Sequence, residues 1–243
     1  MDKSSVGDVP LAQQREAWNR WNAHAREVSV GPISRRQADE MLGWLDAAGV
    51  RAAEILDVGC GTGWMCERLL PYGSVTGIDL AHEVLDRARA RLPQVRFLAG
   101  DLDSLDLPRG GFDVVVSLEV LAHVADQPRF VQRIAALLRP GGLLLLATQN
   151  RPVLERWSEI GAPIPGTHRH WVYARALREL LAPAFRVETL TSIAPVGDQG
   201  LLRLANSVKV NRALGWVVGQ DRLTRWKEQA LLGHTLLVRA RRR

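Results

Sequence analysis

Residues 53–63 read AEILDVGCGTG, an aliphatic run with an acid near its end, followed at once by a glycine-rich turn. The run is typical of a buried β-strand, and the segment after the turn, 65–73, has the pattern of a helix closed by proline and glycine. Such a turn lets the backbone approach a ligand closely and presents the free N–H groups of the helix start. The stretch therefore predicts an α/β fold whose ligand-binding turn contains Gly59, Cys60, Gly61 and Gly63.

The same rhythm of strands and helices continues outward from this stretch. Further strands are predicted at 74–80, 95–101, 112–120 and 143–148, and further helices at 83–92 and 130–138. An alternation of strands with crossover helices indicates a parallel sheet. The segment 112–120 is apolar almost throughout, which is typical of a strand in the middle of such a sheet.

The flanking regions are less regular. Apolar and aromatic residues recur at helical spacing over 14–27, the proline-containing stretch 150–172 is predicted to be a loop, and 174–182 is predicted to be a helix. Two more strands are predicted at 185–193 and 234–241, with a basic, amphipathic insertion at 198–232 between them. We expect one domain over 1–243, made of a helical cap (1–50), a ligand-binding core (51–150) and a final region (151–243) that carries the insertion as a helical lid.

Three acids are placed at or near the ends of the first three predicted strands, where open α/β sheets bind ligands. Asp79 lies 20 residues after Gly59, a position that suits both hydroxyls of an adenosine ribose. Asp101 suits an adenine amine, with the amide of Leu102 reaching a ring nitrogen. Asp57 lies beside the turn, where a carboxylate attracts a cationic cofactor and repels a pyrophosphate. Structural alternatives are a turn cap for Asp57 and an Asx turn for Asp101.

Composition limits the possible functions. The chain has 243 residues, of which 47% are hydrophobic, enough for one α/β domain with a sizeable core. It shows no apolar run of 18 residues and no secretory segment, so we expect a cytoplasmic protein without a transmembrane helix. Cys60 and Cys66 form no CxxC pair, and we expect neither a disulfide framework nor a metal site. The net charge of +6 allows an anionic partner, but the 8 tryptophans are scattered, and we expect no nucleic acid.

Five segments, in this order and spacing, resemble the motifs of class I S-adenosylmethionine-dependent methyltransferases. They are ILDVGCGTG (55–63), VTGIDL (75–80), FLAGDL (97–102), FDVVVSLEVLAHV (112–124) and LLRPGGLLLLAT (137–148). The resemblance covers about residues 50–150. It implies a Rossmann-like, doubly wound, seven-stranded sheet with its last strand antiparallel. It also implies S-adenosylmethionine as cofactor and S-adenosylhomocysteine as product.

Within that family, the segments 119–124 and 166–168 resemble the ubiquinone-biosynthesis O-methyltransferases and their bacterial small-molecule relatives. A second acid often precedes the histidine in that subgroup, whereas this chain has Ala122, which argues against a metal-assisted mechanism. The resemblance implies in-line methyl transfer to a small-molecule acceptor, and a phenolic oxygen gains from a histidine base. The histidines that we expect to serve are His123, after the fourth strand, and His168 and His170, in the loop; surface or structural roles are the alternative for each.

The resemblance and the acids together give the expected cofactor-binding set. Its members are Trp21, Arg35, Asp57, Gly59, Cys60, Gly61, Gly63, Asp79, Leu80, Asp101, Leu102, Leu118 and Glu119. Trp18 shares a helix face with Trp21, and packing is the alternative role for both. By resemblance to the quinone subgroup, Arg35 or its neighbour Arg36 is expected to hold the carboxylate of the cofactor.

Several alternatives stay open. The acceptor atom is oxygen, nitrogen or carbon; an RNA or protein methyltransferase and a non-catalytic S-adenosylmethionine-binding protein are less favoured. A dinucleotide-dependent oxidoreductase shares the glycine turn and Asp79, but Asp57, Asp101 and the sequence LRPGG count against it. The insertion 198–232 is either a lid over the acceptor or a peripheral membrane contact. The sequence does not indicate an oligomeric state.

Overall fold

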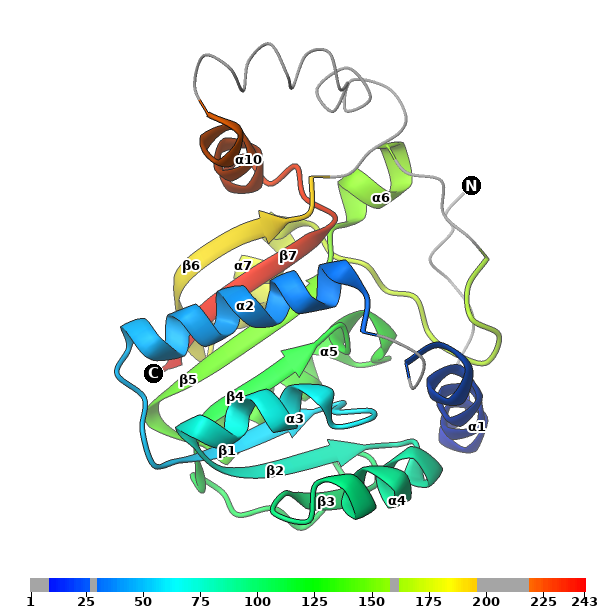
Figure 1. Cartoon of the computed structure of the whole chain (residues 1–243). Coiled ribbons are helices and arrows are strands. Elements are labelled where there is room, and N and C mark those ends of the chain that lie inside the picture. The colour runs from blue at the N-terminus through cyan, green and yellow to red at the C-terminus, as the bar shows by residue number, and fades with distance from the viewer. Residues whose placement is uncertain (1–8, 27–29, 158–161, 196–218) are drawn as a thin grey trace.

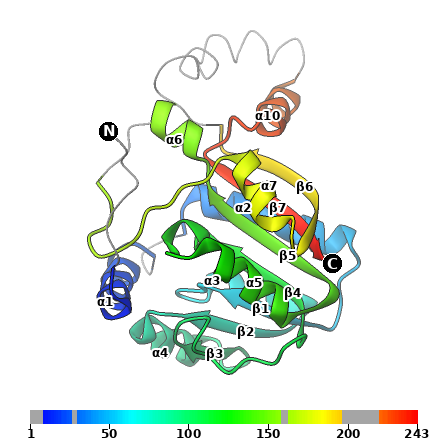
Figure 2. The same ribbon diagram turned by 180° about the vertical axis from the view of Figure 1, so that it is seen from behind.

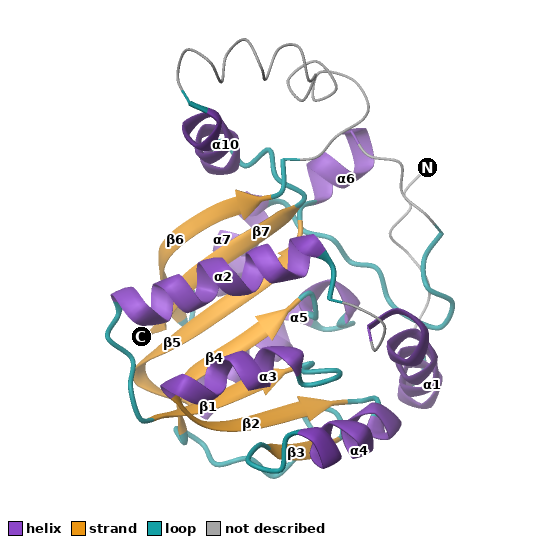
Figure 3. Cartoon of the chain, viewed as in Figure 1, coloured by secondary structure: helices purple, strands orange, loops and turns teal. Residues whose placement is uncertain are grey.

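The computed structural model describes residues 9–26, 30–157, 162–195 and 219–243. Its seven strands form one sheet in the order β3-β2-β1-β4-β5-β7-β6 (Figures 1 and 3). Their bounds are β1 Ala53–Val58, β2 Gly73–Asp79, β3 Arg96–Ala99, β4 Phe112–Leu118, β5 Leu138–Gln149, β6 Phe185–Ile193 and β7 Thr235–Arg242. The predicted Rossmann-like, doubly wound sheet is thereby confirmed.

The pairing directions match the predicted topology. β1 pairs in parallel with β2 and β4, while β2–β3 and β4–β5 are also parallel. β7 lies antiparallel between β5 and β6, so the expected antiparallel last strand is present. The strand order reverses at β1, and the crevice at such a point is where open α/β sheets bind ligands.

Helices cover both faces of the sheet. They are α1 Leu11–Trp21, α2 Pro32–Ala47, α3 Trp64–Leu69, α4 His82–Arg91, α5 Gln127–Leu137, α6 Arg151–Trp157, α7 Ala174–Leu181 and α10 Gln220–Gln229, with the short helices η1 Asn22–Arg26, η2 Leu70–Tyr72 and η3 Leu121–His123. Figure 1 shows α2 and α3 over one face, and Figure 2 shows α5 and α7 over the other. No helix in the described ranges is long and apolar enough to cross a membrane.

Side chains alternate between two apolar layers along each central strand, because successive Cβ atoms of a strand point to opposite faces. Ile55 belongs to the layer with Met41 of α2 and Leu69 of α3. Its neighbour Leu56 belongs to the layer with Ile134 of α5. Burial on both faces explains the continuous apolar runs from which these strands were predicted.

Three predicted boundaries need correction. The stretch 150–172 was predicted to be a loop but begins with α6, since Pro152 lies in the first turn, where a missing N–H costs no helical hydrogen bond. β5 begins at Leu138 rather than at 143, because Leu138 already pairs with Phe112. The helix predicted at 14–27 is instead α1 followed by the π-helix η1. Of the predicted lid 198–232, residues 198–218 lie outside the described residues, and the remainder contains α10.

One buried side chain joins the end of β5 to the turn before β7. The amide nitrogen of Asn150 donates to the carbonyls of Leu231 (2.9 Å) and Gly233 (2.7 Å), and its backbone N–H donates to His234 O (2.9 Å). Asn150 is 1% exposed, so water cannot easily replace these bonds. The contact holds the start of β7 against the carboxyl end of β5.

We expect Asn150→Ala to lower the free energy of unfolding by about 2 kcal/mol, because two buried carbonyls lose their donor. Urea denaturation followed by circular dichroism measures the change. Gln229→Ala, on the exposed side of α10, is the control and is expected to stay within about 0.5 kcal/mol of wild type. Equal stability of the two variants would contradict the role given to Asn150.

Candidate functional site

The glycine-rich turn after β1 closes directly onto the end of β2. The backbone N–H groups of Gly59 and Cys60 both donate to Ile78 O, at 2.8 and 3.0 Å. Gly59 has φ +75°, and a Cβ atom there would lie 2.2 Å from Val120 Cγ2. Only glycine fits this position without displacing the segment after β4.

Asp79 fastens the turn to the end of β2. One carboxylate oxygen accepts the N–H of Gly61 and the other accepts the N–H of Ala81, both at 2.8 Å. Burial raises the pKa of Asp79, and hydrogen bonds from the backbone of Ala81, Gly61 and Leu80 oppose that rise. A carboxylate offers about four lone-pair positions, so this one retains acceptor capacity toward the cavity.

Asp57 lies beneath the turn and is 1% exposed. Burial raises its pKa to about 7, the thiol of Cys66 lowers it by donating a hydrogen bond (3.3 Å), and the charge of Asp79 raises it further. Near neutral pH the side chain is thus poised between acid and carboxylate. A cation placed beside it would favour the carboxylate.

Asp101 follows β3 and forms the Asx turn that was its structural alternative, with Oδ1 accepting the N–H of Asp103 at 2.9 Å. The same residue nevertheless lines the cavity, next to Leu102. The turn fixes the orientation of the carboxylate and leaves part of it exposed to the cavity.

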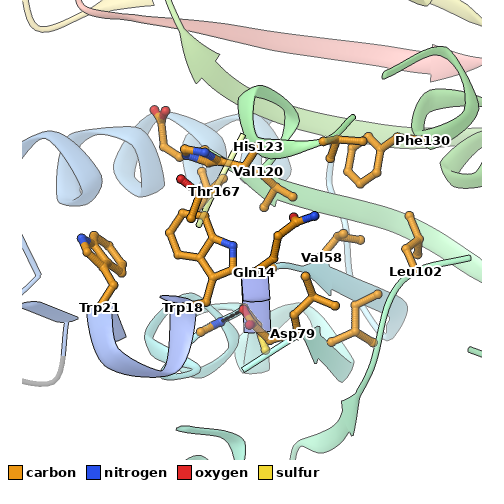
Figure 4. Close-up of a pocket in the computed structure, with 18 of the residues that line it drawn as sticks. Gln14, Trp18, Trp21, Val58, Asp79, Leu102, Val120, His123, Phe130 and Thr167 are labelled. Atoms are coloured by element: carbon orange, nitrogen blue, oxygen red, sulfur yellow. Dashed lines mark hydrogen bonds between the residues drawn. The ribbon is translucent and has the colours of Figure 1, made fainter. Parts of the chain in front are cut away.

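The carboxyl ends of β1, β2 and β3 border one cavity of about 820 Å³, a volume ordinary for small-molecule sites. Figure 4 shows Trp21 on one side of it and Leu102 and Phe130 on the other, with Trp18 between them. α1 supplies both tryptophans, whose ring centroids lie 5.8 Å apart. The N-terminal helix thereby forms one wall of the cavity.

His123 of η3 also lines the cavity, and its surroundings determine which ring nitrogen carries the proton. Its Nδ1 lies 2.8 Å from the carbonyl oxygen of His168, which can only accept, so Nδ1 carries the proton and Nε2 keeps a lone pair. Burial lowers the pKa of His123, the His168 carbonyl opposes this, and the charge of Arg169 lowers it again. The Trp18 ring packs edge-on against the imidazole with a centroid separation of 4.7 Å (Figure 4).

The side chains of the other two predicted histidines, His168 and His170, do not line the cavity. The lining of the cavity takes Thr167, Arg169 and Trp171 from this loop, and among the described residues His168 and His170 do not belong to it. His170 Nδ1 donates to Val124 O at 3.2 Å. Alternation along an extended loop explains why only every second side chain reaches the cavity.

The predicted cofactor-binding residues line the cavity with two exceptions, Arg35 and Gly63. Arg35 points away from it and donates through Nε to Val30 O at 2.8 Å. Ser34 and Gln37 of α2 line the cavity instead, so the face of the helix that reaches the cavity is offset by one residue from the one predicted. Gly63 faces the core, where a Cβ atom would lie 2.8 Å from the ring of Phe97.

Sequence reasoning missed several lining residues. They are Gln14, Ser34, Gln37, Phe130, Gln149, Arg169, Trp171, His234 and Thr235, among others. The guanidinium of Arg169 lies over the Trp171 ring at 4.9 Å. No motif marks these positions, because they converge from α1, α2, α5, the end of β5, the start of β7 and the loop before α7. The one available signal was the helical spacing of Ser34 and Gln37.

Comparison with known proteins gives a consistent family. A family model described as a methyltransferase domain matches residues 56–146. A probable S-adenosylmethionine-dependent methyltransferase of Mycolicibacterium smegmatis is 35% identical over 137 residues, which is 56% of this chain and 52% of that protein. A ubiquinone biosynthesis O-methyltransferase of Xanthomonas oryzae pv. oryzae is 34% identical over 163 residues, which is 62% of this chain and 67% of that protein.

One solved structure with the same fold contains both a cofactor product and a small molecule. It is the 1,6-didemethyltoxoflavin-N1-methyltransferase of Burkholderia thailandensis with bound 1,6-didemethyltoxoflavin and S-adenosylhomocysteine. The TM-score is 0.63 at 21% identity, over 98% of this chain and 93% of that one. The chain spans about half the length of the first curated relatives that it matches.

We expect Asp57→Asn to stabilise the ligand-free protein by about 2–4 kcal/mol at pH 8, because asparagine removes a buried charge. The pKa of Asp57 is about 7 when folded, above its ordinary value, so its protonated form stabilises the fold at low pH. That contribution is lost as the pH rises through about 7, and the advantage of the variant should therefore shrink toward pH 4. Urea denaturation across pH 4–8 tests this.

The control is Asp221→Asn, on the exposed side of α10, which is expected to give no gain at pH 8. A destabilised Asp57→Asn protein at pH 8 would contradict the assigned burial cost.

Proposed function

The chain belongs to the class I S-adenosylmethionine-dependent methyltransferases, and we propose that it transfers a methyl group from S-adenosylmethionine to a small molecule held in this cavity. The observation that carries the proposal is the convergence of Asp57, Asp79 and Asp101 on one cavity at the ends of adjacent strands. A cationic nucleoside is the cofactor that such a set of carboxylates suits best.

Each acid then has a separate task. Asp79 accepts from the ribose hydroxyls with its remaining lone pairs, and Asp101 accepts from the adenine amine with help from the Leu102 amide. The carboxylate of Asp57 attracts the positively charged part of the cofactor. The sulfonium of the cofactor supplies an activated methyl group. Leu80, Leu118 and Trp21, which also line the cavity, provide apolar contact around it.

His123 acts as general base in this proposal. Because Nδ1 donates to the His168 carbonyl, Nε2 is available to accept the proton of a hydroxyl, and the lowered pKa keeps the imidazole neutral near pH 7. The oxygen lone pair of the acceptor forms the new bond to the methyl carbon, and the electrons of the broken C–S bond return to sulfur. The products are the methylated acceptor and S-adenosylhomocysteine, with the proton on His123.

A phenol or similar hydroxyl compound fits the acceptor side best. The Trp18 ring gives the cavity a flat apolar surface beside His123, and Trp171 also lines the cavity. The cavity is bordered by α1 and by the loop that carries Thr167 and Arg169, and its volume of about 820 Å³ is that of a small-molecule site. Exclusion of water and alignment of the two reactants supply much of the rate acceleration.

Calorimetric titration tests the cofactor. We expect micromolar binding of S-adenosylmethionine and none of NADH, and Asp79→Ala should weaken binding at least tenfold, about 1.4 kcal/mol. Asp86→Ala removes an exposed aspartate of α4 and is the matched control, with unchanged affinity. Preference for NADH, or no binding of S-adenosylmethionine, would exclude the proposed function.

Turnover of a panel of phenols tests the base. We expect His123→Gln to lower kcat by about 10²–10⁴-fold while S-adenosylmethionine binds as in wild type, because only proton removal is lost. In the wild type, kcat should fall on the acid side, below the ordinary histidine pKa of 6.5, as Nε2 takes up a proton.

The control for this variant is His24→Gln, whose histidine is exposed on η1. If His123→Gln had the kcat of the wild type, or the same pH profile as the wild type, the reaction would need no base at this position.

A further inference from the structure

One positively charged side chain reaches the cavity from the loop before α7. This loop contributes Thr167, Arg169 and Trp171 to the lining. The Arg169 guanidinium lies over the Trp171 ring, 4.9 Å from the ring centroid. An aromatic face restrains a guanidinium without using one of its N–H donors. We call Arg169 and Trp171 the arginine–tryptophan pair.

The backbone on both sides of Arg169 is fastened to the segment that follows β4. The carbonyl oxygen of His168 accepts from His123 Nδ1 at 2.8 Å. On the other side, the backbone N–H of His170 donates to Ala122 O at 2.7 Å. Because both neighbours of Arg169 are held against η3, the fold itself sets where the arginine stands relative to the imidazole of His123.

The charge of Arg169 acts on the space around that imidazole. Burial lowers the pKa of His123, the His168 carbonyl raises it, and the positive charge of Arg169 lowers it again. A cation that disfavours an imidazolium favours an anion in the same place. Burial also lowers the pKa of Arg169, so its guanidinium has lost part of its hydration. A partly dehydrated cation attracts an anion more strongly than one in bulk water.

Charge is unevenly distributed along the lining of the cavity. The acids at or near the ends of the first three strands are Asp57, Asp79 and Asp101. Among the described lining residues the arginines are Arg129 and Arg169, and Arg129 pairs with Asp103 at 2.7 Å in the loop after β3. His234 also lines the cavity, but burial lowers its pKa, so it is neutral near pH 7. Within the described lining, Arg169 is thus the cation beside His123.

Two further acids line the cavity, and each accepts hydrogen bonds from its own neighbours. Glu119 accepts from the side chains of Gln37 and Thr235. Asp126 precedes α5 and accepts the backbone N–H of Arg129 at 3.0 Å. These contacts hold Glu119 toward α2 and β7 and hold Asp126 toward α5, whereas Arg169 belongs to the loop before α7.

We propose that the arginine–tryptophan pair is an anion-binding subsite for the methyl acceptor, which makes the acceptor a hydroxyl-bearing aromatic compound that presents negative charge to Arg169. A planar guanidinium suits a carboxylate or a phenolate oxygen, and the neighbouring indole rings suit a flat acceptor.

The inference rests on the proposed function, which supplies two sources of the negative charge. One source is a carboxylate elsewhere on the acceptor. The other is the reacting oxygen, whose proton passes to His123 Nε2 while its lone pair forms the bond to the methyl carbon. In the second case the guanidinium stabilises the charge that develops on oxygen before the C–S bond breaks.

The first arm of the test uses protein saturated with S-adenosylhomocysteine and two probes that differ in charge, 4-hydroxyphenylacetate and 4-hydroxyphenylacetamide. If the pair binds a carboxylate of the acceptor, calorimetry should show that the wild type prefers the acid at least tenfold, about 1.4 kcal/mol. Arg169→Met should abolish this preference, and Arg169→Lys should keep part of it because the charge remains. Arg175→Gln, an exposed arginine of α7, is the matched control and should keep all of it.

The second arm uses 4-nitrophenol, which ionises near neutral pH and absorbs visible light as the anion. If the pair faces the reacting oxygen, the bound phenol should ionise about one pH unit lower than the free phenol, a tenfold effect. Arg169→Met should remove this shift and Arg175→Gln should retain it. The acid and the amide of the first arm should then bind the wild type equally.

A wild type that binds S-adenosylhomocysteine but shows neither the preference for the acid nor the shifted ionisation would overturn the proposal. The same conclusion would follow if Arg169→Met kept the effect that the wild type shows. Calorimetry with S-adenosylhomocysteine reports that each variant is folded, and Arg169→Gln carries the test should Arg169→Met lose this binding. Absence of S-adenosylhomocysteine binding in the wild type would instead refute the methyltransferase function itself.

Discussion

The closure of the glycine-rich turn onto the end of β2 is the constraint on which the site depends. Ile78 O accepts two N–H groups of the turn, and the Asp79 carboxylate accepts a third from Gly61. These bonds require the left-handed backbone of Gly59, which also brings the turn against Val120 beyond β4. One local geometry therefore joins the ends of β1, β2 and β4, and places Asp57 beneath a cavity floor made of backbone.

That arrangement places two acidic side chains, Asp57 and Asp79, in a buried environment. Burial raises the pKa of Asp57 and of Asp79, which means that the fold holds both carboxylates less readily than water would. Backbone donors offset this for Asp79, whereas the side-chain donor to Asp57 among the described residues is the weak thiol of Cys66. The protein thus sacrifices stability at a position where a cationic ligand would restore it, which is the usual relation between binding sites and stability.

The sequence was sufficient for the sheet and for the part of the site that lies on consecutive strand ends. The motif at 55–63 and the acids Asp79 and Asp101 are local signals, each fixed by its own strand and turn. The side of the cavity made by Gln37, Gln149 and Thr235 could not be foreseen, because those residues meet only after β7 inserts between β5 and β6. Arg35 lies off the cavity lining for a smaller reason: one residue along a helix turns a side chain by about 100°, and Ser34 takes the place on the lining.

The loop before α7 shows how such long-range contacts decide chemistry. The sequence singled out His123, His168 and His170 as candidate bases, and the structure gives the three side chains different places. His168 meets His123 through its main-chain carbonyl, and that oxygen determines which imidazole nitrogen keeps its proton. The backbone N–H of His170 donates to Ala122 O at 2.7 Å, which holds the loop at the distance this contact requires. The backbone groups of the two loop histidines therefore help to position His123, a role that residue type alone does not predict.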